Sequence, residues 1–252
     1  MTNSRLKGVR EACRRLGEVT AQIYDFVQVG VSPWEIEQKA RQLITKQGGQ
    51  PSFTTVGDYQ WATCINLNDG VVHGIPTSRQ PLKSGDLVTV DLGLLLNGFH
   101  SDNAFTKIVG QSTPEKDRFL QAGKEAIQAA LDQLKPGAYV GSISQATEQT
   151  LKKYGYTPAI GLTGHGVGRH LHEDPMIPCL LTQPIEHTPR LRRGQTLAIE
   201  IIYMQGSSDL VLLEDDWTIV TRDGKLAAVF EETVEVTDDG YSILTYPALF
   251  QR

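Results

Sequence analysis

The sequence is poor in cysteine. Among its 252 residues there are only three, Cys13, Cys64 and Cys179, and no C-x-x-C spacing occurs. A scattered, odd-numbered set neither builds a disulfide framework nor supplies a thiolate zinc site. We therefore expect all three thiols to be reduced and buried like small apolar side chains.

Long apolar runs and an excess of positive charge are also missing. No run approaches the roughly 18 apolar residues of a membrane-spanning helix, and residues 1–7 lead into an amphipathic segment rather than a signal-peptide core. The net charge is −5, whereas a protein that binds a phosphate backbone needs a basic surface. The basic cluster Arg190, Arg192 and Arg193 is predicted to be a solvated turn. We expect a cytoplasmic protein whose main partner is neither a membrane nor a nucleic acid.

Periodicity and capping signals predict two pairs of helices separated by strands. Apolar residues from Leu6 to Val27 recur at spacings of three and four, which is typical of one face of a helix. A second helix begins after Ser32 with Pro33 at its first position and Glu35 completing a capping box, and Gly48-Gly49 ends it. The remaining predicted elements are strands at Thr63–Leu67, Leu87–Leu96 and Phe99–Val109, and helices at about 114–134 and 142–154.

The two halves of the chain resemble each other. Gly30 and Gly48, which bracket the second helix, match Gly137 and Gly155 at one constant offset, and residues 82–91 match residues 191–200. Because turn chemistry of this kind is common before strands, a chance match is the alternative, but we favour a duplication. We predict one catalytic domain, 1–252, built from two similar α/β halves of about 1–110 and 111–252.

The match places Asp91 on Glu200, each at the end of an apolar strand. Asn97-Gly98 predicts a two-residue type I′ hairpin turn, because both positions tolerate a positive φ. Centred on that turn, Asp91 and Asp102 share one face as diagonal neighbours, roughly 7–8 Å apart between Cα atoms. Two metal ions could be bridged there, and Gly93, opposite Asp102, is expected to leave space for them.

Three further residues complete the candidate metal site. Glu200 and Glu231 follow apolar strand residues, where an unpaired buried acid is costly, and His165 lies in the glycine-rich segment 164–168. Solvent-facing acids on an edge strand are the ordinary alternative, but four acids recurring in two half-repeats favour a shared site. Four carboxylates and one imidazole favour manganese, iron(II) or cobalt. A competing interpretation, a mononuclear zinc site of His165, His170 and His172, leaves the acids unexplained.

Taken together, these residues resemble the methionine aminopeptidases of the pita-bread metallopeptidase fold, in their short bacterial form. The likeness covers nearly the whole chain. The matching motifs are Val72-His73-Gly74-Ile75-Pro76, Val90-Asp91, Phe99-His100-Ser101-Asp102, Gly164-His165-Gly166-Val167-Gly168-Arg169, His172-Glu173-Asp174-Pro175, Ile199-Glu200, Asp216-Trp217-Thr218 and Phe230-Glu231.

The resemblance implies an α+β fold in which helices cover a curved antiparallel sheet made of two pseudo-symmetric halves. It implies a monomeric aminopeptidase that removes the N-terminal residue, above all the initiator methionine, from peptides and nascent proteins. It also implies two divalent metal ions, cobalt, manganese or iron(II) with zinc as a further candidate. The implied metal ligands are Asp91, Asp102, His165, Glu200 and Glu231, the catalytic residues are His73, His172 and Glu200, and the substrate pocket adds Tyr59, Cys64, Leu171 and Trp217.

The sequence departs from the family pattern at several positions. Ile201 stands where a proline usually follows the acid, and Glu232 stands where a histidine is usual. In the side-chain pocket, Phe53 and Val56 lie in a loop that is usually rich in tyrosine, and Leu171 replaces a phenylalanine. Two alternatives follow: an aminopeptidase of another specificity, such as cleavage before proline, and a non-catalytic binding module, which predicts lost ligands.

Overall fold

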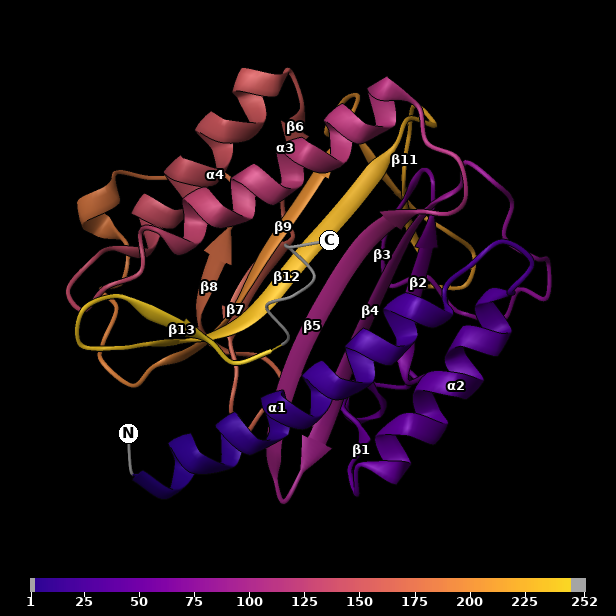
Figure 1. The fold of residues 1–252 in the computed structure, drawn as a ribbon. Helices are drawn as coiled ribbons and strands as arrows, with labels where there is room; N and C mark the ends of the chain where they lie inside the picture. The colour runs from indigo at the N-terminus through magenta and orange to yellow at the C-terminus, as the bar shows by residue number, and fades with distance from the viewer. Residues whose placement is uncertain (1–2, 246–252) are drawn as a thin grey trace.

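In the computed structural model, which describes residues 3–245, helices cover one face of a curved antiparallel sheet (Figure 1). Each pair of helices precedes in the chain the central strands that it covers. The first pair is α1 (Asn3–Phe26) and α2 (Pro33–Lys46), and the second pair is α3 (Pro114–Leu131) and α4 (Val140–Tyr154). Within residues 3–245 no helix is both long and apolar enough to cross a membrane.

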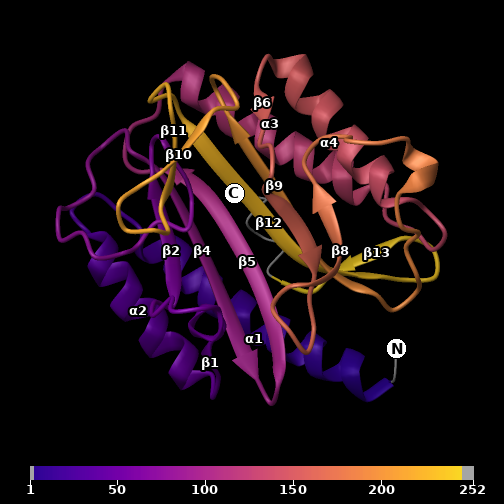
Figure 2. The ribbon, with the colours of Figure 1, turned by 180° about the vertical axis from the view of Figure 1, so that it is seen from behind.

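The main sheet runs in the order β1-β4-β5-β12-β9-β7-β8, and β2, β6 and β13 pair with β4, β9 and β12. Figure 2 shows it from the side away from the helices. Its strands are β1 (Gln50–Pro51), β2 (Thr63–Leu67), β4 (Leu87–Leu96), β5 (Phe99–Ile108), β6 (Thr157–Pro158), β7 (Thr163–Gly166), β8 (Glu173–Pro178), β9 (Thr196–Met204), β12 (Ala227–Val236) and β13 (Tyr241–Ile243). A smaller sheet joins β3 (Gly70–Val72), β10 (Leu210–Leu212) and β11 (Ile219–Thr221), and short 3₁₀ turns form at η1 (Phe53–Thr55) and η2 (Ile185–His187).

The predicted helix boundaries are confirmed at α2 and differ slightly in the second half. Ser32 caps α2 and forms the capping box with Glu35. The α3 helix ends at Leu131 rather than near Leu134, because the next residues form tight turns in which the Leu134 amide donates to Leu131 O. Leu134 is nevertheless buried, so the apolar pattern continues beyond the end of the helix.

The glycines that the sequence match paired share a backbone conformation. Gly30 and Gly137 have φ of 93° and 84°, and Gly48 and Gly155 have φ of 76° and 82°. All four lie in the left-handed region, which favours glycine. This agreement supports the match between the halves, while the division of residues 1–252 into half-repeats of one domain stays a prediction.

The predicted hairpin between β4 and β5 is confirmed. Asn97 and Gly98 both have positive φ, and the register pairs Leu96 with Phe99, Gly93 with Asp102 and Asp91 with Ala104. The strand ends one residue earlier than expected, at Ile108. The turn thus fixes which face of each strand looks toward the helices, because a slip of one residue would reverse it.

Alternation along the strands separates a helix-covered face from an open one. Val90 and Leu92 pack into the cluster that includes α1, and Ile199 and Ile201 pack into the cluster that includes α3 and α4. The acids between them, Asp91 among them, therefore point to the opposite face.

The three cysteines are free and buried, as predicted.

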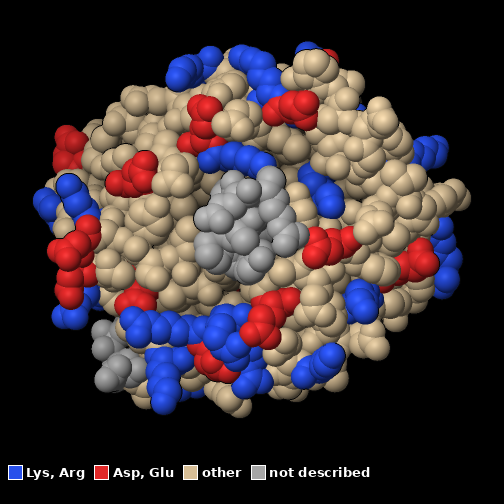
Figure 3. Space-filling view, in the orientation of Figure 1, with Lys and Arg blue, Asp and Glu red and all other residues tan. Residues whose placement is uncertain are grey.

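Charges of both signs are interspersed over the surface in Figure 3. Along α1, for example, Arg14 and Arg15 both pair with Glu11. Arg190, Arg192 and Arg193 are exposed in the segment before β9, but Arg190 is not a free turn residue as predicted, since its guanidinium donates to Gly137 O and lies 4.0 Å from the centroid of the Tyr139 ring. On the face that Figure 3 shows, the mixture of signs is typical of solvated charges.

A buried glutamate joins α2 to the start of β2. The Glu37 side chain is 0% exposed, and its carboxylate accepts the Ala62 and Thr63 amides and the Thr63 hydroxyl while pairing with Arg41. Removing it leaves those donors buried without an acceptor. We expect Glu37→Ala to lower the free energy of unfolding by about 3–5 kcal/mol, since each buried donor left without an acceptor costs about 1–3 kcal/mol.

Urea unfolding measures this loss, with Gln38→Ala, at an exposed neighbouring position of the same helix, as the control. The control should change the unfolding free energy by no more than about 0.5 kcal/mol. A loss below about 1 kcal/mol for Glu37→Ala would contradict the assigned role.

Candidate active site

Three of the predicted acids form one row across the sheet. Asp91 pairs with Ala104 on β5, Ala104 pairs with Glu231 on β12, and Glu231 pairs with Glu200 on β9. Cross-strand partners have neighbouring side chains on one face. The small Ala104 side chain separates Asp91 from Glu231 and leaves room between the two carboxylates.

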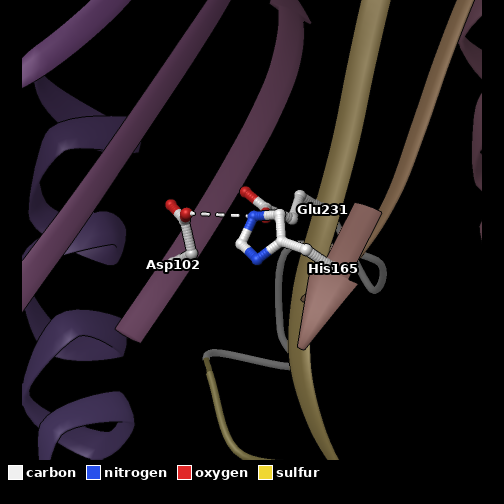
Figure 4. A group of neighbouring side chains, drawn as sticks. All are labelled: Asp102, His165 and Glu231. Atoms are coloured by element: carbon white, nitrogen blue, oxygen red, sulfur yellow. Dashed lines mark ion pairs between the residues drawn. The ribbon is translucent and has the colours of Figure 1, made fainter. Parts of the chain in front are cut away.

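Asp102 and His165 lie in the adjacent row. Asp102 is two residues from Ala104 along β5, and His165 pairs with Ala198, two residues from Glu200. The His165 ring reaches from β7 toward Asp102, with its Nε2 3.7 Å from Asp102 Oδ2 (Figure 4). Ligand atoms of Asp102, His165 and Glu231 all lie within 4.8 Å of one another. The sheet thus gathers residues that are far apart in the sequence.

The tautomer of His165 is set by its backbone neighbour. Its Nδ1 is 3.0 Å from Gly166 O, which can only accept, so Nδ1 carries the hydrogen. Nε2 then presents a lone pair toward Asp102. Burial, together with the nearby His172, lowers the pKa of His165 to about 4. The ring is therefore neutral at pH 7, as a metal ligand must be.

The carboxylates are crowded and desolvated. Burial raises the pKa of Asp91 to about 7, and burial with neighbouring carboxylates raises the pKa of Asp102, Glu200 and Glu231 well above the ordinary value. Asp91 Oδ1 is buried with no hydrogen-bond partner among the described residues. Such a cluster is costly unless a cation compensates it. Its oxygen and imidazole donors fit a divalent metal ion.

All eleven predicted site residues line a single cavity: Tyr59, Cys64, His73, Asp91, Asp102, His165, Leu171, His172, Glu200, Trp217 and Glu231. Val72, Leu162, Thr163 and Ile202 line it too and were not predicted. Alternation could have found two of them, because Thr163 and Ile202 lie two residues from His165 and Glu200 on the same strands.

One end of the cavity is apolar. Phe53, Tyr59, Cys64 and Leu171 form a buried cluster, and Trp217 packs against it. The Tyr59 ring meets Trp217 edge-on at 5.0 Å, and its hydroxyl donates to Thr63 O at 2.8 Å. The Tyr59 hydroxyl therefore already has a hydrogen-bond partner in the backbone. This end can accept an apolar side chain.

The role expected for Gly93 was wrong. A Cβ on Gly93 would lie 2.6 Å from Ser52 Cβ and 2.9 Å from a Phe53 ring carbon. The space beside Gly93 is therefore filled by the segment around η1, not left for metal ions. The glycine lets this segment pack closely on β4 and so places Phe53 in the cavity wall.

Two further histidines, His73 and His172, line the same cavity. The His172 ring meets the His165 ring edge-on at 4.5 Å, and the His73 ring lies 6.2 Å from Trp217. Burial lowers the pKa of both, and the nearby His172 lowers that of His73 further. His170 is exposed and does not line this cavity, and the ligand group found within residues 3–245 joins His165 to acids instead.

Two departures from the family pattern face away from the cavity. Ile201 packs on the helix side of the sheet. Glu232 is also buried there, accepting from Thr245 and from Asn103 Nδ2, and burial raises its pKa to about 8. Neither lines the cavity, so they alter the support of the site rather than its surface.

The raised carboxylate pKa values predict a pH-dependent response to metal. A folded-state pKa above the unfolded value favours folding at low pH, and this contribution is lost as pH rises through the folded pKa, which is about 7 for Asp91. A metal ion binds the ionised form, so its stabilisation should grow with pH. We expect manganese to raise Tm by about 5 °C more at pH 8 than at pH 5.5, since 1 kcal/mol shifts Tm by roughly 2–4 °C at this size.

Thermal unfolding with manganese or with EDTA at both pH values measures this difference. An equal shift at both pH values, or a larger one at pH 5.5, would contradict the prediction.

Comparisons with known proteins show the family and the fold of the chain. Residues 7–238 match the model of metallopeptidase family M24. Methionine aminopeptidase of Aquifex aeolicus is 38% identical over 246 residues, 95% of each chain, and methionine aminopeptidase 1 of Bacillus subtilis is 38% identical over 237 residues, 94% of each. A crystal structure of methionine aminopeptidase from Thermotoga maritima covers 98% of both chains, with a TM-score of 0.93 at 34% identity. The predicted pita-bread fold is confirmed by this similarity.

Proposed function

The chain belongs to metallopeptidase family M24, and from this premise we propose that it is a metal-dependent methionine aminopeptidase acting on the N-termini of peptides and nascent proteins. The observation that carries the proposal is one cavity in which metal-ligating side chains adjoin an apolar pocket. An N-terminal residue held in such a pocket would place the first peptide bond beside the ligands. We further propose that the protein works as a cytoplasmic monomer.

We assign two divalent ions to Asp91, Asp102, His165, Glu200 and Glu231. Cobalt, manganese and iron(II) are the favoured ions and zinc is a further candidate, because the donors are mostly oxygen atoms. When bound, such ions supply an activated water and a Lewis acid for the peptide carbonyl.

The remaining chemistry is assigned to the protein's own groups. Glu200 collects the proton of the attacking water and passes it to the leaving amine. His172 donates a hydrogen bond to the developing negative charge or to the scissile amide. His73 contacts the scissile-peptide nitrogen. Tyr59, Cys64, Leu171 and Trp217 enclose the side chain of the first residue.

Two observations favour this function over the alternatives. The relatives of 38% identity that match along nearly their whole length are named methionine aminopeptidases, which favours methionine over cleavage before proline. A non-catalytic binding module predicts lost ligands, whereas all five ligand positions are filled and line the cavity.

A peptide panel with metal quantification tests the proposal. The purified protein, with manganese or cobalt supplied, is offered Met-Ala-Ser, Leu-Ala-Ser and Met-Pro-Ser peptides and an Xaa-Pro dipeptide. We expect release of free methionine from Met-Ala-Ser with the highest kcat/KM. A protein that holds two metal ions yet cleaves none of these would refute the function, and preferred cleavage of the Xaa-Pro dipeptide would refute the specificity.

A further inference from the structure

A carboxylate helps to hold the segment that carries Leu171 and His172 into the cavity. Glu173 Oε1 accepts the amide of Arg169 at 2.7 Å and the amide of His170 at 3.0 Å. The chain therefore folds back on itself around Leu171 and His172. Both residues lie between these amides and Glu173, so they belong to the turn that the carboxylate closes.

The other oxygen of Glu173 binds α1. Glu173 Oε2 accepts from Arg5 Nη2 in a partly buried ion pair, with the side chains 18% and 27% exposed. Although burial raises the pKa of Glu173, the hydrogen bonds from His170 and Arg5 outweigh it and hold the pKa below its ordinary value. The first turn of α1 is thereby joined to the segment beside His172.

Close packing strengthens this connection. A Cβ on Gly168 would lie 2.3 Å from Arg5 Nη2, so the glycine admits the guanidinium. The His100 amide donates to Gly168 O at 2.8 Å, and Arg169 lies 4.1 Å from the centroid of the Phe99 ring. The segment is thus clamped between α1 and the β4–β5 hairpin, and Arg5 is the charged group that α1 contributes.

We propose that Arg5 and Glu173 are positioning residues that hold His172 in its catalytic orientation, so that the first turn of α1 takes part in building the active site. This inference rests on the proposed function. It assigns to Arg5 no contact with substrate or metal, because neither Arg5 nor Glu173 lines the cavity.

Amide hydrogen exchange tests the clamp without reference to activity. In Arg5→Ala and Glu173→Gln, the amides of Arg169 and His170 should exchange at least about 10-fold faster than in wild type. Arg5→Ala removes the cation that holds the Glu173 carboxylate, and Glu173→Gln replaces that carboxylate by a neutral amide. Arg5→Lys, which keeps a cation, should restore part of the protection. Arg10→Ala, which removes another α1 ion pair, to Glu235, is the matched control and should leave these amides unchanged. Unchanged exchange in both test variants would overturn the clamp.

Steady-state kinetics on Met-Ala-Ser test the link to His172. We expect Arg5→Ala and Glu173→Gln to lower kcat by about 10- to 100-fold with KM within about 2-fold and bound metal unchanged, since small misplacements of a catalytic group cost that much. Arg5→Ala added to His172→Ala should cause no further loss, because the residue acts through the ring. A full additional loss, an unchanged kcat or an equal loss of metal would overturn the inference. If wild type cleaves no peptide, the proposed function fails while the exchange result still decides the clamp.

Discussion

Asp102→Asn is expected to lower kcat/KM on Met-Ala-Ser by more than about 100-fold while stabilising the metal-free protein. Removing a group that only supports a metal ligand lowers metal affinity or activity by about 10- to 100-fold. Removing a ligand itself should lower activity by more than that. The opposite effect on stability follows from repulsion. Asp102 is 4% exposed, and burial and the charges of Asp91 and Glu200 raise its pKa. Replacing it by a neutral group of the same shape should add about 1–2 kcal/mol to the metal-free unfolding free energy at pH 7.5.

The two halves of this prediction need separate measurements. Metal content and kinetics report the ligand role, and urea unfolding in EDTA reports the repulsion. Asp239→Asn, an acid-to-amide change at an exposed position, is the control and should alter neither. If the metal-free Asp102→Asn protein is less stable than wild type, then repulsion between Asp102 and the neighbouring carboxylates does not destabilise the metal-free protein. If it keeps two metal ions and full activity, Asp102 is not a ligand.

His172→Ala is expected to lower kcat by about 10²–10³-fold, the usual cost of removing one donor that stabilises developing negative charge. Its KM should change by only a few-fold and its metal content should not change, because His172 is not one of the five residues to which we assign the metal ions. Burial lowers the pKa of His172 and so favours the neutral ring, which keeps one N–H to donate. His172→Gln, which keeps a donor, should recover part of the loss.

His187→Ala, at an exposed histidine in η2, controls for a general effect of losing an imidazole. Kinetics and metal quantification on the same preparations separate the outcomes. A loss of bound metal in His172→Ala would assign the ring to the metal site. An unchanged kcat would remove it from the chemistry.

The sequence predicts the local parts of this site because short-range rules control them. The Asn97-Gly98 turn alone predicts the pairing of Gly93 with Asp102 that the structure has. Capping residues located the start of α2, and the matched glycines located helix ends that share a left-handed backbone. Local rules do not reach as far at Gly93: its partner on the neighbouring strand was predicted, but the residue packed on its face was not, because Ser52 belongs to another element.

The sequence by itself determined the helices α1 to α4, the β4–β5 hairpin and the faces of its strands and, through its motifs, the candidate site residues. Only the tertiary structure decided which of them meet. β12 pairs with both β5 and β9, so Glu231 lies between Asp91 and Glu200. His165 reaches Asp102 from β7, which follows β9 in the sheet order. Arg5 likewise meets Glu173 across most of the chain. The physical reason is that turns and caps act over a few residues, whereas strand order and side-chain packing depend on the burial of the whole sheet.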